Sequence, residues 1–151
     1  MPKERPSALV KAMNFLAVRS LSELELFNKL RRAGYPDDEC DAAIAECVNR
    51  HYIDDGQLTA DSVDLLRQRN LGSRQIRQKL ARRGLDSEAV SEILASSPEE
   101  EEAAAMRAME SKLRLLSRES DPRKKREKLF RFMASRGFSA GIIFKLMDKL
   151  T

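Results

Sequence analysis

The chain has 151 residues, of which 42% are hydrophobic and 34% charged, and its formal net charge is +4. Aromatic residues make up only 5% and tryptophan is absent, so the apolar positions fall mainly to good helix formers and not to the aromatic and β-branched residues of sheets. No run approaches the roughly 18 apolar residues of a membrane span. There is no signal-peptide pattern at the start, and two cysteines indicate no disulfide framework, so we expect a cytoplasmic protein.

Helix start and stop signals are legible from the first residues onward. Residues 7–19 have room for one helix, and Ser22 followed by Glu25 predicts the start of a second. The pair forms a capping box, in which the Ser22 hydroxyl accepts a bond from the third helical N–H and Glu25 reaches back to the cap. Gly34 ends this helix, because glycine adopts the left-handed C′ conformation without a Cβ clash.

The same signals return in the middle of the chain. The next helix is predicted over about residues 55–70, with the pair Asp54-Asp55 at its start. These carboxylates could be imagined as metal ligands, but a helix N-cap explains them with nothing further. Ser73 is predicted to open the following helix, and Gly84 ends it.

The acidic run at residues 97–102 resembles a linker at first sight. We interpret it as the start of a helix over residues 98–118, because serine suits the cap, proline suits the first helical position and acids favour the positive end of the helix dipole. Asp121 before Pro122 opens a further helix, which Gly137 ends. The connections are short, and no segment is predicted to be a strand.

The three helix-ending glycines hold equivalent places in an internal repeat. Apolar residues recur at the same six offsets around each of them, namely Leu26, Leu30, Tyr35, Cys40, Ala43 and Ile44, then Ile76, Leu80, Leu85, Val90, Ile93 and Leu94, then Leu129, Met133, Phe138, Ile143, Leu146 and Met147. Unrelated helical hairpins also show helix-ending glycines and apolar residues at helical spacing. Even so, the recurrence predicts an all-α fold, a tandem array of three three-helix repeats over residues 7–51, 52–96 and 97–150.

The small net charge hides two strongly basic stretches. Seven bases and no acid lie within residues 67–83, and ten bases against three acids lie within residues 112–136. Between them, residues 84–102 hold seven acids and no base. Solvated helix faces and last-turn bases that complement helix C-termini explain part of this pattern. They do not explain the bases at residues 123–126, since bases in a first turn oppose the helix dipole.

The basic stretches favour an anionic partner, either a phosphate backbone or an acidic protein groove. From charge alone, we predict that the residues contacting DNA or a protein partner are Arg67, Arg69, Arg74, Arg77, Lys79, Arg82, Arg123, Lys124, Lys125 and Arg126. The acidic stretch argues against a simple nucleic-acid binder, whose whole surface tends to be basic.

Residue types that catalysis or metal binding needs are scarce. Cys40, Cys47 and the single histidine His51 could share one helix face, but one rigid helix cannot easily wrap three ligands around a tetrahedral zinc ion. We expect the two thiols to lie in the core. No glycine-rich phosphate loop, HExxH motif or Gly-x-Ser-x-Gly elbow occurs. The sequence therefore predicts a binding protein with no enzymatic activity, cofactor or metal.

One set of residues is distinctive when taken together. Its centre is Tyr52-Ile53-Asp54-Asp55, Leu58, Ala60, Arg67, Gly72, Ile76, Lys79-Leu80 and Arg83-Gly84-Leu85. Its flanks are Ser20-Leu21-Ser22-Glu23-Leu24, Lys29-Leu30, Gly34-Tyr35 and Phe132-Met133-Ala134-Ser135-Arg136-Gly137-Phe138-Ser139. In these residues the chain resembles the RecX family of recombinase regulators over about residues 7–150.

The resemblance implies an elongated, curved array that binds the RecA recombinase, with no membrane and no small-molecule substrate. Members lie along the groove of the RecA filament on single-stranded DNA and suppress ATP hydrolysis, strand exchange and co-protease activity, within DNA repair and the SOS response. The resemblance does not single out the contact residues chosen above.

Two other hypotheses stay open. One is an independent helical DNA-binding regulator, since helix-turn-helix readers also use short hairpins with a glycine turn. The acids Asp86, Glu88 and Glu92, which follow Gly84 on the would-be recognition helix, disfavour it. The other is a helical scaffold for an unknown acidic partner.

Overall fold

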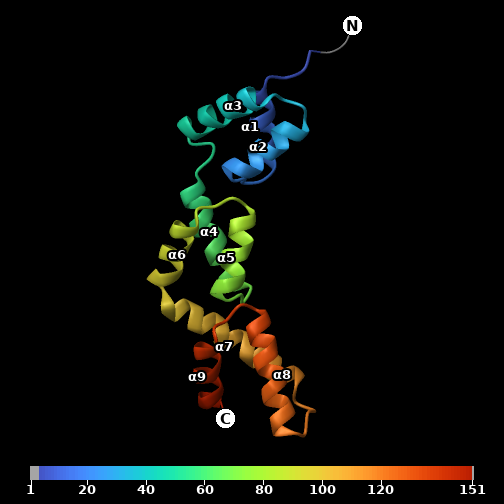
Figure 1. Ribbon diagram of the computed structural model, residues 1–151, viewed down its shortest axis with the longest axis vertical. Helices are drawn as coiled ribbons and strands as arrows, with labels where there is room; N and C mark the ends of the chain where they lie inside the picture. Colours follow the sequence, from blue (N-terminus) through green and yellow to red (C-terminus); the bar gives the residue numbers. More distant parts are fainter. Residues whose placement is uncertain (1–3, 151) are drawn as a thin grey trace.

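The computed structural model describes residues 4–150, and within this range every regular element is an α-helix (Figure 1). The helices are α1 (Ala8–Val18), α2 (Glu23–Arg32), α3 (Asp37–Asn49), α4 (Asp55–Gln68), α5 (Ser73–Arg82), α6 (Ser87–Ser96), α7 (Pro98–Leu115), α8 (Pro122–Ser135) and α9 (Ala140–Leu150). The predicted all-α repeat array is therefore confirmed.

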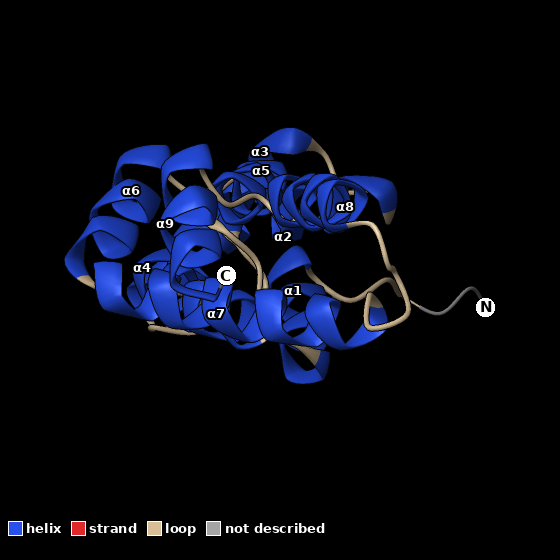
Figure 2. Ribbon diagram, turned by 90° about the horizontal axis from the view of Figure 1, so that it is seen from below, coloured by secondary structure: helices blue, strands red, loops and turns tan. Residues whose placement is uncertain are grey.

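Three bundles of three helices follow one another along the long axis of an elongated, curved array (Figure 1). Seen along that axis, the bundles overlap one another (Figure 2). Each bundle has its own hydrophobic cluster, the first between Ala8 and Ile53, the second between Val63 and Leu94, and the third between Ala104 and Met147. Because these cores are separate, we propose to keep the predicted division after residues 51 and 96, with the difference that Ile53 packs into the first core.

The capping box and the glycine turns form as predicted. Ser22 accepts a bond from the Glu25 N–H at 3.1 Å, and the Glu25 carboxylate accepts one from the Ser22 N–H at 2.9 Å. Gly34, Gly84 and Gly137 have φ angles of 95°, 77° and 101°, the left-handed region that favours glycine. Every aligned apolar residue of the repeat is buried except the partly buried Ile93, so the sequence repeat is also a packing repeat.

Ser73 does not cap its helix as predicted. The N-cap is Gly72, and Ser73 is the first helical residue. The Ser73 N–H and hydroxyl both donate to the Glu101 carboxylate, at 2.8 and 2.5 Å. This serine therefore ties α5 to α7 in the next repeat, a contact that overrides its local preference for the cap.

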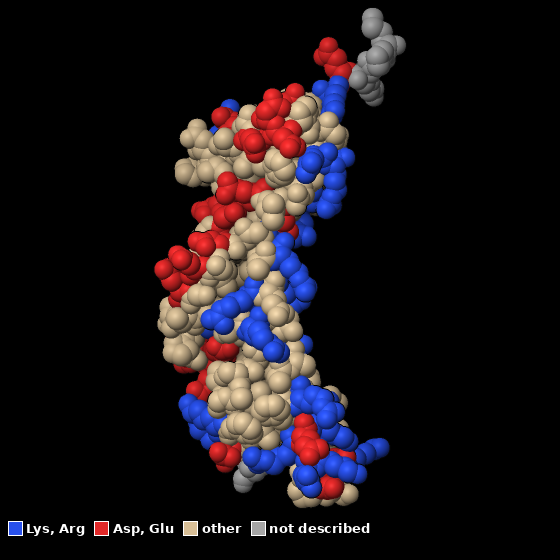
Figure 3. Space-filling view, in the orientation of Figure 1, with Lys and Arg blue, Asp and Glu red and all other residues tan. Residues whose placement is uncertain are grey.

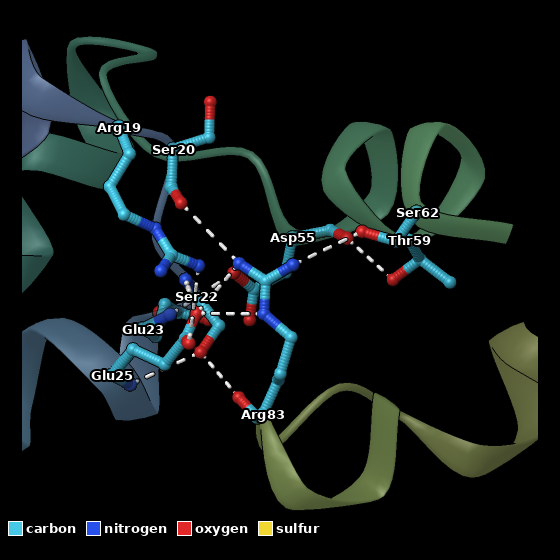
Figure 4. Close-up of polar contacts among 9 residues, drawn as sticks. All are labelled: Arg19, Ser20, Ser22, Glu23, Glu25, Asp55, Thr59, Ser62 and Arg83. Atoms are coloured by element: carbon cyan, nitrogen blue, oxygen red, sulfur yellow. Dashed lines mark hydrogen bonds and ion pairs between the residues drawn. The ribbon is translucent and has the colours of Figure 1, made fainter. Parts of the chain in front are cut away.

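Arg83, directly after α5, joins the second repeat to the first (Figure 4). Its guanidinium donates to the Glu25 carboxylate at 2.9 and 3.1 Å, to the Ser62 hydroxyl at 3.2 Å and to the Ser20 carbonyl at 3.3 Å. Its own carbonyl accepts a bond from the Ser22 hydroxyl. We call these contacts between the end of α5 and the start of α2 the first junction.

Arg136, directly after α8, joins the third repeat to the second in the same way. Its guanidinium donates to the Asn70 carbonyl at 3.3 Å, and its carbonyl accepts a bond from the Gly72 N–H at 2.9 Å. The Gly137 carbonyl accepts from the Arg74 N–H at 3.2 Å. We call these contacts between the end of α8 and the start of α5 the second junction.

The two junctions use equivalent residues of the repeat. Arg83 and Arg136 each precede the helix-ending glycine, and Ser20 and Asn70, whose carbonyls they contact, stand at the same place before the second helix. The first repeat has Ala33 where the others have arginine. There the guanidinium of Arg5 donates to the Ala33 carbonyl at 2.6 Å, so Arg5 satisfies the carbonyl at this end of the array.

The thiols of Cys40 and Cys47 lie in the first core, as predicted. Burial raises the pKa of both thiols above the ordinary value. Because the thiolate is the reactive form, we expect a water-soluble disulfide reagent to modify the native protein at least on the order of 100-fold more slowly than the urea-unfolded chain. Comparing the release of the reagent chromophore in the two states checks this, and rapid labelling of the native protein would place a thiol at the surface.

Candidate interaction surface

Along the first two repeats, acidic and basic side chains gather on different sides of the array, whereas acids stand among the bases of the third repeat (Figure 3). In that view acids follow the edge formed by α4 and α6, whereas Lys and Arg side chains cross the middle over α5 and surround the third repeat. The exposed acids on α4 and α6 include Asp61, Asp64, Glu88 and Glu92. In the second repeat the two charge signs are therefore separated in space as well as in sequence, with bases on α5 and acids on α4 and α6, and α8 adds a second group of bases.

Five of the predicted contact residues are exposed on or beside α5, namely Arg69, Arg74, Arg77, Lys79 and Arg82. Buried Ile76 and Leu80 hold the opposite face of α5 in the second core. Among the described residues, no ion pair within 4 Å engages any of these five bases. Their charges are therefore available to a partner.

Arg67 is buried, which corrects its prediction as a contact residue. The residue is 4% exposed, and its guanidinium donates to the Leu94 carbonyl at 3.0 Å and to the Glu100 carboxylate at 3.3 Å. These contacts hold the end of α6 and the start of α7 against α4. Arg67 therefore stabilises the connection between the second and third repeats, and we leave it out of the proposed contact surface.

The second predicted cluster lies in the first turns of α8. Arg123 and Lys124 are exposed, and Lys125 is half-buried. Arg123 lies 3.5 Å from Glu127, and Arg126 lies 4.0 Å from Asp148 on α9, distances typical of weak surface pairs.

Other bases of the third repeat are engaged within the chain. Lys145 and Lys149 donate to Glu102 at 3.1 and 3.3 Å, and these hydrogen bonds lower the pKa of that carboxyl group. Lys128 donates to Glu119 at 2.7 Å and lowers its pKa in the same way. The three lysines therefore contribute less to an outside contact than the less engaged bases of α5 and α8.

The two predicted clusters are not adjacent, because α5 meets the C-terminal end of α8 while residues 123–126 begin it. The Arg74 guanidinium donates to the Ala134 carbonyl at 2.5 Å, near that C-terminal end. Between the clusters lie Phe130 and Arg131, which charge reasoning did not select. The signal that could have found Phe130 is its place one turn after Arg126, on the same helix face.

Sequence reasoning also missed the role of Arg83 and Arg136. Bases in a last turn complement the helix dipole, and that explanation accounts for both residues without any contact between repeats. The available signal was the residue before the repeat glycine, which is arginine in the second and third repeats and alanine in the first. Only the second and third repeats have a preceding repeat to contact.

Metal sites and membrane spans are both absent from the part of the chain that the structure describes. Within residues 4–150, no group of three or more His, Cys, Asp or Glu side chains is placed to hold a metal ion. None of the described helices combines the length and apolar character that crossing a bilayer requires.

The fold and surface define an elongated helical-repeat protein that presents a basic side built from α5 and α8. The family model "RecX, first three-helix domain" matches residues 8–47, and "RecX, third three-helix domain" matches residues 99–147. Together these segments make up more than half of the chain. The chain belongs to the RecX family of regulatory proteins.

Individual relatives agree with this assignment. The chain is 29% identical over 143 residues to Regulatory protein RecX of Deinococcus radiodurans. The matched region covers 94% of this chain and 67% of the relative. The chain is 26% identical over 144 residues to Regulatory protein RecX of Legionella pneumophila. That match covers 95% of this chain and 94% of the relative. The crystal structure of RecX from Lactobacillus salivarius has a TM-score of 0.85 at 20% identity and covers 95% of this chain and 94% of its own, which supports the fold.

Proposed function

We propose that this protein regulates the RecA recombinase by binding in the groove of the RecA filament on single-stranded DNA, where it inhibits ATP hydrolysis, strand exchange and co-protease activity. It acts without catalysis, in the cytoplasm, within DNA repair and the SOS response. The observation that carries the proposal is the pair of RecX domain matches at opposite ends of one continuous helical array.

The shape supports this role. Repeats stacked end to end offer an extended contact surface, which suits a partner that is itself a periodic assembly. The exposed bases of α5 lie at the middle of the array and those of α8 in its last repeat, so two separated basic sites could contact neighbouring protomers or the bound DNA. We propose Arg69, Arg74, Arg77, Lys79, Arg82, Arg123, Lys124, Lys125 and Arg126 as these contacts.

Independent DNA reading is less well supported. The helix that follows Gly84 is α6, and its exposed Glu88 and Glu92, together with its cap Asp86, would face phosphate with like charge. A DNA-binding regulator of the helix-turn-helix class places this helix in the major groove. The acidic side of the array therefore argues against that alternative.

The test measures ATP hydrolysis by RecA on single-stranded DNA while this protein is added below one molecule per RecA. We expect strong inhibition at such ratios, because one array bound along the filament affects several protomers. Absence of inhibition, with the protein still retained on DNA alone, would reject the proposal in favour of independent DNA binding.

The same assay tests the basic side. The double variant Lys79→Ala and Arg82→Ala is expected to raise the half-inhibitory concentration about three- to tenfold, since each exposed contact contributes about 0.5 kcal/mol. The control is Lys29→Ala with Arg32→Ala, which removes the equivalent bases one repeat earlier. Equal effects of the two double variants would mean that net charge alone matters.

A further inference from the structure

Two adjoining hollows cross the third repeat beside the second junction. One, of about 550 Å³, is lined by Arg126, Phe130, Arg131 and Phe144 among others. The other, of about 510 Å³, is lined by residues that include Arg74, Arg77 and Phe138. Phe130 and Ala134 line both hollows, so together they form one groove over α8 between α5 and α9. We call it the junction groove.

The junction groove contains a pair of stacked aromatic rings. The ring centroids of Phe130 and Phe144 are 5.1 Å apart, and the ring planes make an angle of 29°. Phe144 is 49% exposed, whereas Phe138 in the adjacent core is 4% exposed. A large flat apolar surface is thus presented to solvent inside a groove, a placement that burial in the core does not explain.

Positive charge frames the rings on both sides. Arg74 and Arg77 extend from α5, and Arg126 and Arg131 extend from α8. Two acids also line the groove, namely Glu101, which accepts bonds from Ser73, and Glu127, which lies 3.5 Å from Arg123, so four arginines stand against two carboxylates. In Figure 3 an uncharged region over α8 and α9 lies below the Lys and Arg side chains of α5.

A ligand that fits this groove must offer both flat apolar groups and negative charges. Single-stranded nucleic acid has both, in its bases and its phosphates. Its bases stack on aromatic rings, its phosphates pair with arginine, and the bases of a duplex are not free to stack in this way. The polar lining residues Ser73 and Ser139 are already engaged, with Glu101 and with the α9 backbone. The residues that line the two hollows include no Asn or Gln, the side chains that read adenine edges, so we expect binding to tolerate any sequence.

We infer that the junction groove binds single-stranded nucleic acid directly, with a base stacked on Phe144 and phosphates held by Arg77 and Arg131. An acidic protein segment would satisfy the arginines but would leave the exposed ring without a flat partner. The inference deepens the proposed function, because it adds a direct DNA contact to an array that binds the filament. Its test does not require RecA.

The chain lacks tryptophan, so the variant Phe144→Trp carries a unique fluorescent reporter in the groove. Addition of an unlabelled oligothymidine is expected to quench this fluorescence, as stacking of a base on the indole requires. Poly-glutamate at the same charge concentration should quench it much less. Quenching by poly-glutamate and not by the oligonucleotide would overturn the inference in favour of an acidic peptide.

Affinity for a labelled oligothymidine, measured by fluorescence anisotropy, provides the second test. Phe144→Ala is expected to weaken binding about tenfold or more without changing its salt dependence. Arg77→Ala should both weaken binding and flatten its dependence on salt, by about 0.7 in the logarithmic slope for each phosphate that the variant no longer neutralises. The control Tyr52→Ala removes another half-exposed aromatic ring outside the groove and should have no effect.

Circular dichroism shows whether each variant is folded, and Phe144→Leu keeps an apolar side chain at the site if the alanine variant is not. Unchanged affinity of a folded Phe144→Ala variant would overturn the inference. The proposed function fails separately, if the wild-type protein binds the oligonucleotide through Phe144 and does not inhibit RecA.

Discussion

Replacing Gly72 by alanine is expected to destabilise the protein by about 3 kcal/mol, because the new methyl group would collide with the backbone of the third repeat. A Cβ at this position would lie 2.4 Å from the Gly137 carbonyl carbon and 2.5 Å from its oxygen. Gly72 has a φ of −86°, which alanine adopts freely, so the whole effect arises from this contact. The backbone cannot give way without breaking the Gly72 N–H bond to the Arg136 carbonyl.

Urea unfolding followed by circular dichroism measures this effect. In repeat proteins, stability is close to a sum of repeat and interface terms, so a weakened second junction should also broaden or split the transition. The matched control is Gly141→Ala in α9, where the nearest atom is the Ser139 hydroxyl oxygen at 4.0 Å. That variant should be as stable as the wild type or more stable by up to about 1 kcal/mol. Equal stability of both variants would show that the repeats do not meet at Gly72.

Replacing Arg83 by alanine is expected to destabilise the protein by about 2 kcal/mol. The change leaves the half-buried Glu25 carboxylate without its strongest partner and removes the bonds to Ser20 and Ser62. Loss of one partner of a fully buried pair costs about 3–5 kcal/mol, and we reduce this because the side chains of both residues are 23% exposed. The neighbouring Arg82→Ala should change stability by no more than about 0.5 kcal/mol. A similar loss in both variants would mean that the first junction contributes nothing specific.

The dependence of stability on pH isolates the same ion pair. Burial acts to raise the pKa of Glu25, but the hydrogen bonds from Arg83 and the Ser22 N–H, with the charges of Arg83 and Arg19, lower it below its ordinary value of 4.5. A lowered carboxyl pKa gives stability that is present above pH 4.5 and is lost as pH falls through the folded-state pKa. Glu23 acts in the opposite direction, because burial and the nearby Asp55 raise its pKa. Comparing urea midpoints of wild type and Glu25→Gln across this range should show a smaller acid loss in the variant.

Helix boundaries and cores could be predicted from the sequence because their causes are local. Ser22 and Glu25 are three residues apart, and each helix-ending glycine acts on the turn that precedes it. The aligned apolar residues needed only a helical period and a repeat to be assigned to the core. Contacts within one repeat were therefore within reach of the sequence.

Contacts between repeats could not be predicted from the sequence. Arg83 and Glu25 are 58 residues apart, and Arg67 and Glu100 are 33 apart, so no local pattern links them. A buried arginine and an exposed one look alike in a basic stretch, which is why charge reasoning placed Arg67 on the contact surface. The junction groove was missed for the same reason, since Phe130 and Phe144 belong to different helices and meet only after α8 and α9 pack.

Both junctions include bonds to peptide groups, which every amino acid supplies, and at the second junction the bonds described above all end on such groups. The arginines contact the carbonyls of Ser20 and Asn70, and the Gly72 and Arg74 N–H groups bond to carbonyls of the next repeat. Evolution can therefore exchange most surface residues and keep the rise and turn from one repeat to the next. Such tolerance agrees with a TM-score of 0.85 between two chains that are only 20% identical. A frame of this kind lets its outward faces adapt to a changing partner while the spacing between them stays constant.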